Sequence, residues 1–375
     1  MPDASLILGI ETSCDETAAA VVGADRVIHS NRIASQLEQH QQHGGVVPEI
    51  AARAHLSLID KVINAALEEA GVGIADIDVV AATAGPGLIG GVLVGSMTAK
   101  GIATSRGIPY FAINHLEGHA LSARLTCSIH FPYLLLLVSG GHSQLLAVEA
   151  AGRYHRYGTT LDDAAGEAFD KAAKKLDLGL PGGPRLEAAA ETGDATAFAL
   201  PRPLKGADHC HFSFSGLKTA LANTWDGLTE EQRGERQNLA NAAASLQAAI
   251  CDCLEDRSWQ AMQRFRSDYP QCPQPDFVVA GGVAANRLIR GTLAAVAETG
   301  GFGFHAPPLP LCTDNAAMIA WAAAERIAAG LPADSMASEA VPRWPLDPAA
   351  PAPQLGRRKA AARAEATDRQ GKTVP

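Results

Sequence analysis

The chain has 375 residues, of which 47% are hydrophobic and 19% charged, a composition typical of a soluble globular protein with room for two domains. Its formal net charge of −9 excludes general binding of nucleic acids through bulk charge. The charge is uneven, because residues 356–375 hold six Lys/Arg and two Asp/Glu, or +4, which leaves −13 on the other 355 residues. A polyanionic partner would have to meet a local basic patch, this C-terminal segment or another subunit.

The sequence favours a cytoplasmic protein without a membrane segment. The seven cysteines show no Cys-x-x-Cys spacing, which indicates reduced thiols in a reducing compartment. Residues 1–10 lack the basic start of a signal peptide. The longest uncharged apolar stretch, residues 84–99, is too short to span a bilayer comfortably. Its glycines at positions 87, 91 and 95 predict a helix packed closely against a sheet.

The first part of the chain alternates short apolar runs with polar turns and one long helix. Residues 6–10 and 18–22 predict two strands of a hairpin, joined by a turn rich in hydroxyls and carboxylates. Pro48 begins a predicted helix that continues to residue 70 and stops at a glycine. Residues 78–82 predict a buried strand, followed by a glycine-rich turn and the helix of small residues.

The same order recurs further along the chain. Residues 133–138 and 144–148 predict two strands around a Ser-Gly-Gly turn, and residues 276–280 predict a strand that ends in a glycine turn before a helix starting near residue 285. This weak internal duplication favours two similar α/β halves around a cleft. Further interpretations are helices at 164–176 and 237–266, a loop at 181–184, an irregular stretch at 212–216 and a disordered basic tail at 349–375.

His115 and His119 form the most informative local pattern. If their segment is helical, the two imidazoles lie on one face, one turn apart, and can share a metal ion. Asp314, just before an Ala-rich helical run, is a candidate third ligand, although a carboxylate there can also be a helix cap. Two His and one Asp would leave positions open for water or substrate.

A metalloprotease is the first competing interpretation of such a histidine pair. Protease sites of this type use His-Glu-x-x-His, with the glutamate directly after the first histidine. Here Glu117 lies two residues after His115, about 200° around a helix. It should therefore point away from a metal held by the histidines.

Two glycine turns could approach a phosphate. In Ser139-Gly140-Gly141 the backbone N–H groups are accessible, although such a turn is also common in ordinary hairpins. The turn at 281–283 lacks the dinucleotide-binding fingerprint, and no Walker A motif occurs. Asp170 could accept hydrogen bonds from a ribose or pair with Lys174 on a helix surface, and Glu187 is ambiguous in the same way.

Seven ordered motifs together closely resemble the TsaD family, the tRNA adenosine threonylcarbamoyltransferases, over residues 6–345. They are residues 9–17, the His115/His119 element, and residues 138–142, 163–171, 212–218, 281–287 and 312–315. The resemblance implies an α/β fold of the duplicated actin-like, sugar-kinase-like and Hsp70-like type. It divides the chain into two domains and the tail. Residues 1–113 plus 314–348 form the first domain, and residues 114–313 form the second.

The resemblance also implies site residues. One divalent metal per subunit, usually iron with zinc as an alternative, would be held by His115, His119 and Asp314. The positions that would bind threonylcarbamoyl-adenylate, or ATP or AMP, are Leu137, Val138, Ser139, Gly140, Gly141, Asp170, Gly183, Glu187 and Asn286. Further candidates for the cleft are Glu11, Ser13, Asp15, Gly281 and Gly282.

The implied reaction transfers the threonylcarbamoyl group from its adenylate to N6 of adenosine 37, in tRNAs that read codons beginning with A, and releases AMP. Expected partners are tRNA, a TsaB-like paralogous subunit, a small TsaE-like ATPase and an upstream threonylcarbamoyl-adenylate synthase. No general base is evident, and His142 is a candidate by position alone. A sugar-kinase-like phosphotransferase or a non-catalytic scaffold paralogue would also be compatible with this fold.

Overall fold

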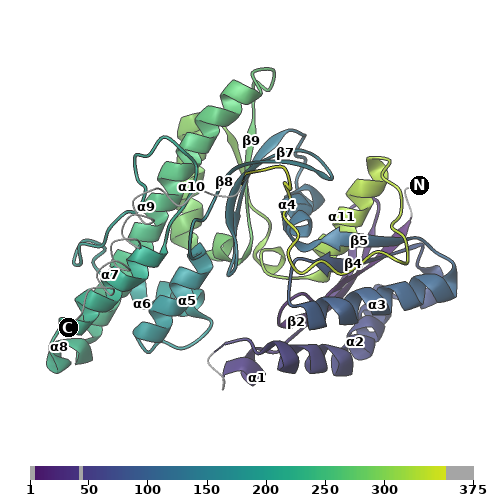
Figure 1. Cartoon of the computed structure of the whole chain (residues 1–375), viewed down its shortest axis with the longest axis horizontal. Coiled ribbons are helices and arrows are strands. Elements are labelled where there is room, and N and C mark those ends of the chain that lie inside the picture. Colours follow the sequence, from purple (N-terminus) through teal and green to yellow (C-terminus); the bar gives the residue numbers. More distant parts are fainter. Residues whose placement is uncertain (1–4, 42–44, 352–375) are drawn as a thin grey trace, which may run out of the picture.

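The computed structural model describes residues 5–41 and 45–351, which form two five-stranded sheets (Figure 1). The first sheet has the order β3-β2-β1-β4-β5 and the second β10-β9-β6-β7-β8. The strands of the first are β1 (Leu6–Glu11), β2 (Glu16–Gly23), β3 (Ile28–Ser35), β4 (Val79–Gly85) and β5 (Tyr110–Asn114). Those of the second are β6 (Tyr133–Val138), β7 (Ser143–Ala150), β8 (Arg153–Thr159), β9 (Asp276–Ala280) and β10 (Gly303–His305).

The two sheets repeat one topology. In each, three consecutive strands form an antiparallel meander, and the first of the three also pairs in parallel with a later strand, which pairs in parallel with the fifth. Thus β1, β2 and β4 correspond to β6, β7 and β9. The predicted duplication of two α/β halves is confirmed.

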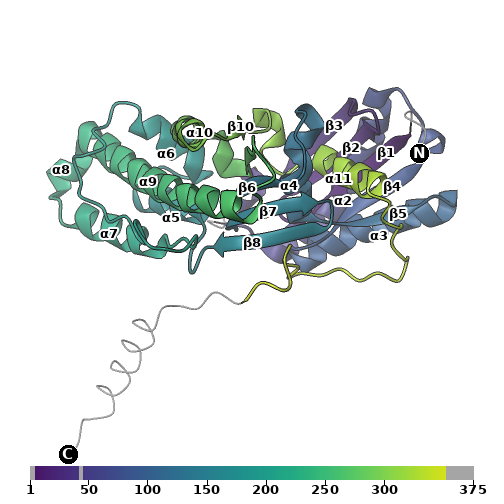
Figure 2. The ribbon, with the colours of Figure 1, turned by 90° about the horizontal axis from the view of Figure 1, so that it is seen from above.

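Helices separate and cover the sheets, as Figures 1 and 2 show. Helices α4 (His115–Thr126) and α11 (Ala316–Ala328) lie between the sheets, where their buried side chains share one core with both inner sheet faces. The outer face of the first sheet packs on α2 (Pro48–Ala70) and α3 (Ile89–Arg106). The outer face of the second packs on α5 (Ala165–Lys175), α6 (Gly182–Ala190), α7 (Ser215–Asp226), α9 (Arg236–Asp268) and α10 (Arg287–Gly300).

Short elements complete the described chain. They are the helices α1 (Leu37–Gln41) and α8 (Glu230–Gly234) and the 3₁₀ turns η1 (Ile74–Asp76), η2 (Gly282–Ala285) and η3 (Leu309–Leu311). Within residues 5–41 and 45–351, no helix is both long and apolar enough to cross a membrane. All seven cysteines belong to the described part and are free thiols.

Most of the predicted elements are present, but two local interpretations were wrong. The predicted loop at 181–184 is instead the start of α6, because Pro184 falls in the first turn of the helix, where its missing N–H costs nothing. Residues 212–216 are only partly irregular, since α7 begins at Ser215. The helix expected near residue 285 begins at Arg287, after η2, with Asn286 as its cap. Strands β3, β5, β8 and β10 were not foreseen.

Small residues in α3 and just before it bring the helix against the β1–β2 turn. A Cβ on Gly87 would lie 2.6 Å from the Ser13 carbonyl oxygen, and one on Gly91 would lie 2.4 Å from the Thr12 carbonyl oxygen. The Thr12 hydroxyl in turn donates to the Gly91 carbonyl at 2.8 Å. The predicted close packing of this helix is therefore confirmed, and it fixes the turn that reaches the cleft.

The C-terminal segment reaches the second sheet. Asp347 accepts hydrogen bonds from the backbone N–H of Arg156 on β8 and from those of Ala349 and Ala350. The first residues of the predicted disordered tail are therefore held by these contacts. Residues 352–375 lie outside the described part of the chain, so disorder there stays a prediction.

Candidate functional site: a histidine and aspartate cluster beside a cavity

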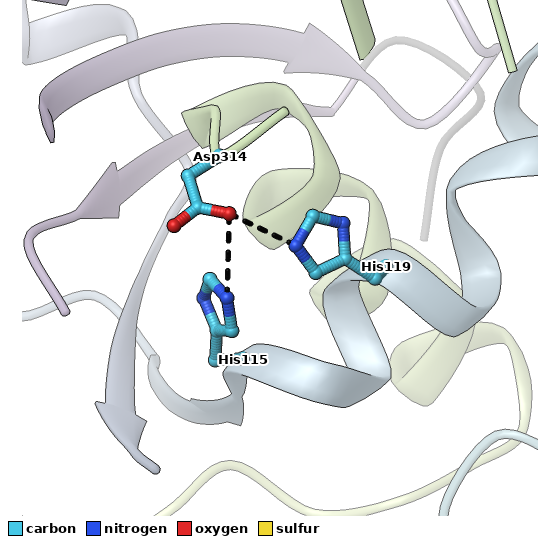
Figure 3. Close-up of side chains that lie close together, drawn as sticks. All are labelled: His115, His119 and Asp314. Atoms are coloured by element: carbon cyan, nitrogen blue, oxygen red, sulfur yellow. Dashed lines mark hydrogen bonds and ion pairs between the residues drawn. The ribbon is translucent and has the colours of Figure 1, made fainter. Parts of the chain in front are cut away.

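Helix α4 places both histidines of the predicted metal pair on one face. The helix begins at His115, and the Asn114 side chain caps it by accepting from the Leu116 N–H at 2.9 Å. Asp314 lies just ahead of α11 and points between the two rings (Figure 3). Its Oδ1 is 3.0 Å from His119 Nε2 and 3.5 Å from His115 Nε2. The structure thus brings together three residues that are up to 199 positions apart.

This donor set fits a divalent metal. One nitrogen or oxygen from each of the three residues lies within 4.8 Å of the others. An ion with bonds of about 2.0–2.2 Å to nitrogen and oxygen holds neighbouring ligand atoms about 3 Å or slightly more apart, close to the 3.0 and 3.5 Å that separate Asp314 Oδ1 from the two imidazole nitrogens. Burial opposes ionisation of Asp314, but the two histidines outweigh it and hold the pKa of the carboxyl well below its usual range. A metal-ligating carboxylate must be ionised, and this one is.

Glu11 and Ser13, which the resemblance suggested only as further cleft residues, contact His115 directly. Glu11 Oε2 lies 2.9 Å from His115 Nδ1, and Ser13 Oγ lies 3.2 Å from the same nitrogen. Burial alone would lower the pKa of His115, but Asp314 and Glu11 raise it well above its ordinary value. The Nδ1 side of His115 is thus occupied by the protein, and its Nε2 faces Asp314.

Glu117 lies on the opposite side of α4 from the cluster, as its helical phase predicts. Its carboxylate accepts from the Gly152 N–H at 2.9 Å and forms an ion pair with Arg326 Nη2 at 2.6 Å. The side chain is 1% exposed. It therefore braces α4 against its neighbours and cannot serve as the base of a metalloprotease at the histidine pair.

A cavity of about 370 Å³ adjoins the cluster. Thr313, the neighbour of Asp314, lines it, as do Asp15 of the β1–β2 turn and Glu16, the first residue of β2. Several of the predicted adenylate-binding and cleft residues lie on its wall, namely Asp15, Gly140, Asp170, Gly183, Glu187, Gly282 and Asn286. The His115, His119 and Asp314 cluster and this cavity are thus neighbours, linked through the adjacent residues Thr313 and Asp314.

Comparison with known proteins decides the family. A profile described as "TsaD: tRNA N6-adenosine threonylcarbamoyltransferase" matches residues 27–321. The chain belongs to the TsaD family.

Relatives of this name are similar over nearly the whole chain. One from Rhizobium meliloti (strain 1021) is 57% identical over 346 residues, covering 91% of this chain and 95% of the relative. One from Brucella anthropi is 56% identical over 362 residues, covering 95% of this chain and 99% of the relative. Among solved structures, HypF of T. kodakarensis matches 88% of this chain and 49% of its own with a TM-score of 0.58 at 14% identity, a likeness of fold alone.

Not every residue suggested by the TsaD resemblance faces the cavity. Leu137 and Val138 are fully buried in β6. The residues that do not line the cavity wall are Leu137, Val138, Ser139, Gly141 and Gly281. Gly281 has a φ of 97°, and a Cβ there would lie 2.3 Å from the Val138 carbonyl oxygen. Its lack of a side chain therefore serves the packing of β6 against the β9 turn.

The Ser-Gly-Gly turn offers fewer N–H groups than its sequence suggests. The Ser139 N–H donates to the His142 carbonyl at 2.8 Å inside the turn. None of the hydrogen bonds among the described residues uses the N–H of Gly140 or Gly141. These two groups remain for an anion. Burial, reinforced by His115 and His119, lowers the pKa of His142 to about 4, so this imidazole is neutral near pH 7.

Three polar residues on the cavity wall already have protein partners. Asp170 Oδ1 accepts from the Gly182 N–H at 2.8 Å, and burial raises the pKa of this carboxyl. Glu187 Oε1 accepts from the backbone N–H of Arg287 at 2.9 Å. Asn286 caps α10 and donates to Gln247 at 2.9 Å. Each is thereby held in place and has at most part of its hydrogen-bonding capacity left for a ligand.

Sequence reasoning missed Glu16, Phe169 and Thr313 on the cavity wall. Burial, together with Asp314 and Asp15, raises the pKa of Glu16 to about 9. The carboxylate-rich turn at 11–17 was a signal for Glu16. Phe169 lies directly before Asp170 and Thr313 directly before Asp314, so proximity to the motifs could have indicated both.

Proposed function

We propose that this chain transfers a threonylcarbamoyl group from threonylcarbamoyl-adenylate to N6 of adenosine 37 in tRNAs that read codons beginning with A. Membership of the TsaD family assigns it to the tRNA N6-adenosine threonylcarbamoyltransferases. The observation that carries the finer proposal is that the His115, His119 and Asp314 cluster lies next to a cavity of about 370 Å³, whose wall includes Thr313, the neighbour of Asp314. A donor with one adenylate end and one carbonyl end fits such a two-part site.

The metal would be held by His115 Nε2, His119 Nε2 and an Asp314 oxygen. Iron(II) is the proposed occupant, with zinc as the alternative, since imidazole and carboxylate suit both. When bound, it would supply Lewis-acid polarisation of the group to be transferred. The same three ligands make a kinase site less suitable, because Mg²⁺ prefers oxygen ligands.

The other residues would bind and orient the donor. The N–H groups of Gly140 and Gly141 would hold the adenylate phosphate and stabilise the charge that develops on it. Asp170, Asn286 and Glu187 would position the nucleoside end on the cavity wall. The N6 nitrogen attacks the carbonyl carbon, the bond from that carbon to the phosphate oxygen breaks, and AMP leaves with the electron pair while N6 loses a proton.

Because the chain is acidic, we expect partner proteins to contribute to the surface that binds tRNA. A charge of −13 outside the C-terminal 20 residues opposes a polyanion. We therefore propose that a TsaB-like subunit and a TsaE-like ATPase contribute to the tRNA surface. A separate synthase would supply the adenylate, and all of these would act in the cytoplasm.

The test is transfer of labelled threonine to unmodified tRNA with threonylcarbamoyl-adenylate supplied and the candidate partners added. We expect label at adenosine 37 and stoichiometric release of AMP. Absence of transfer, with partners shown to be active with another family member, would refute the proposal. Parallel assays of peptide cleavage and sugar phosphorylation address the protease and kinase activities.

Gly282 provides a test of the cavity. It lines the wall, and a Cβ there would meet no atom within 4 Å, so a side chain can project into the cavity without disturbing the fold. We expect Gly282→Leu to weaken adenylate binding at least about tenfold, a loss of about 1.4 kcal/mol. Gly216→Leu on α7 is the matched control, because that position is exposed, equally free of neighbours and away from this cavity.

Isothermal titration with AMP and a thermal denaturation curve measure binding and folding separately. Equal affinity in Gly282→Leu and the parent protein would show that the adenylate binds elsewhere.

A further inference from the structure

Glu11 is a buried carboxylate whose two oxygens have different partners. It ends β1 and is 1% exposed. Its Oε2 contacts His115 Nδ1 at 2.9 Å and also accepts from the Thr83 hydroxyl. Its Oε1 accepts from the Ser13 N–H at 2.5 Å. One side chain thus joins the histidine of the metal cluster to the backbone of the β1–β2 turn.

The two histidines of the cluster differ in how they are held. His119 Nδ1 is buried and has no hydrogen-bond partner among the described residues. His115 Nδ1, by contrast, faces Glu11 and Ser13. A carboxylate only accepts hydrogen bonds, so it holds a proton of His115 on Nδ1. When a metal binds, Nε2 is then the nitrogen that gives up its proton and offers a lone pair, on the side that faces Asp314.

The β1–β2 turn carries the second half of the link. Ser13, held by Glu11 Oε1, is followed closely by Asp15 and Glu16, which line the adenylate cavity. A shift of the Glu11 carboxylate would therefore move both the ring that binds metal and the wall that contacts the donor.

We propose that Glu11 is a positioning residue that sets the tautomer of His115 for metal binding and, through Ser13, ties the metal cluster to the wall of the cavity. This inference rests on the metal site of the proposed function, but it concerns metal affinity and ring protonation, which are measured without any transfer reaction.

Glu11→Gln tests the proposal because an amide of the same shape has only one oxygen and cannot accept hydrogen bonds from both His115 Nδ1 and the Ser13 N–H. If the amide NH₂ faces His115, it donates to Nδ1, moves the ring proton to Nε2 and opposes metal binding. If the amide oxygen faces His115, the NH₂ meets the Ser13 N–H and the turn loses its acceptor. Either orientation breaks one half of the link.

The matched control is Glu325→Gln. Glu325 is also a buried carboxylate in an ion pair, with Arg124 Nε at 2.8 Å, but it lies at the far end of α11 from Asp314. We expect Glu11→Gln to weaken zinc binding about 10–100-fold, as loss of a partner of a metal-binding histidine usually does, and Glu325→Gln to leave it unchanged. Competition with a chromogenic chelator gives the zinc Kd.

Nitrogen-15 NMR of the zinc-loaded parent protein gives an independent readout. We expect the proton of His115 on Nδ1 and the zinc on Nε2. Zinc on Nδ1, or equal zinc affinity in the parent and Glu11→Gln, would overturn the proposal even if transfer activity is normal. If Glu11→Gln does not fold, Glu11→Asp retains the charge but shortens the reach, and it must show weaker zinc binding for the proposal to stand.

Discussion

His119→Ala is expected to lower metal content to background and to reduce threonylcarbamoyl transfer more than about 100-fold, because loss of a ligand should exceed the roughly 10–100-fold cost of losing a ligand's partner. His119 Nε2 lies 3.0 Å from Asp314 Oδ1, and the ring is 1% exposed, so alanine leaves a buried gap where the ligand nitrogen was. Asp314→Ala should give the same result, since it removes an oxygen that lies near both rings.

His155→Ala is the matched control for these variants. His155 lies half-exposed on β8, and its nearest acidic partner is 4.0 Å away. It should keep both metal and transfer. Metal content is measured by elemental analysis after anaerobic loading with iron(II) or zinc, and transfer by labelled threonine on tRNA. Full transfer by a His119→Ala protein that carries no metal would refute a role for the cluster in the reaction.

The cluster of His115, His119 and Asp314 could be predicted from the sequence because most of its geometry is local. Spacing of four residues puts His115 and His119 on one helix face whatever the rest of the fold does, and only Asp314 had to come from elsewhere. The phase of Glu117 was predictable for the same reason. Its partners, Gly152 and Arg326, were not, because they depend on how other elements pack against α4.

The surroundings of the cluster depend on long-range pairing and could not be derived locally. Glu11 and His115 are 104 positions apart and meet only because the sheet brings β1 close to β5, the strand that precedes α4, with β4 between them. Similarly, the role of Glu187 was ambiguous in sequence, and its partner, the backbone N–H of Arg287, lies 100 positions away. The start of α6 at Gly182 was missed because proline and glycine indicate a loop and a first helical turn equally well.

Gly91→Ala is expected to destabilise the protein by about 1–3 kcal/mol, the usual cost of an extra group in a packed position. The added Cβ would lie 2.4 Å from the Thr12 carbonyl oxygen and 3.1 Å from the His55 ring. The backbone oxygen cannot rotate away as a flexible side chain could. The turn would therefore have to shift, together with Ser13 and its contact to His115.

Gly101→Ala on the same helix should have the opposite effect. No atom lies within 4 Å of a Cβ at Gly101, and the position is exposed, so only helix propensity changes and stability should rise by about 1 kcal/mol. Urea unfolding curves give the change in the free energy of unfolding for both variants, provided that the slope of this free energy against urea concentration is unchanged. The pair separates a general property of glycine in helices from the specific contact with the β1–β2 turn.

Transfer kinetics then connect this packing to the site. If α3 fixes the turn for function, Gly91→Ala must lower transfer at temperatures where the variant is still fully folded, while Gly101→Ala must not. A Gly91→Ala protein that is less stable but fully active when folded would show that the turn tolerates the shift. In that case Glu11 alone, through its buried contacts, would be sufficient to hold His115.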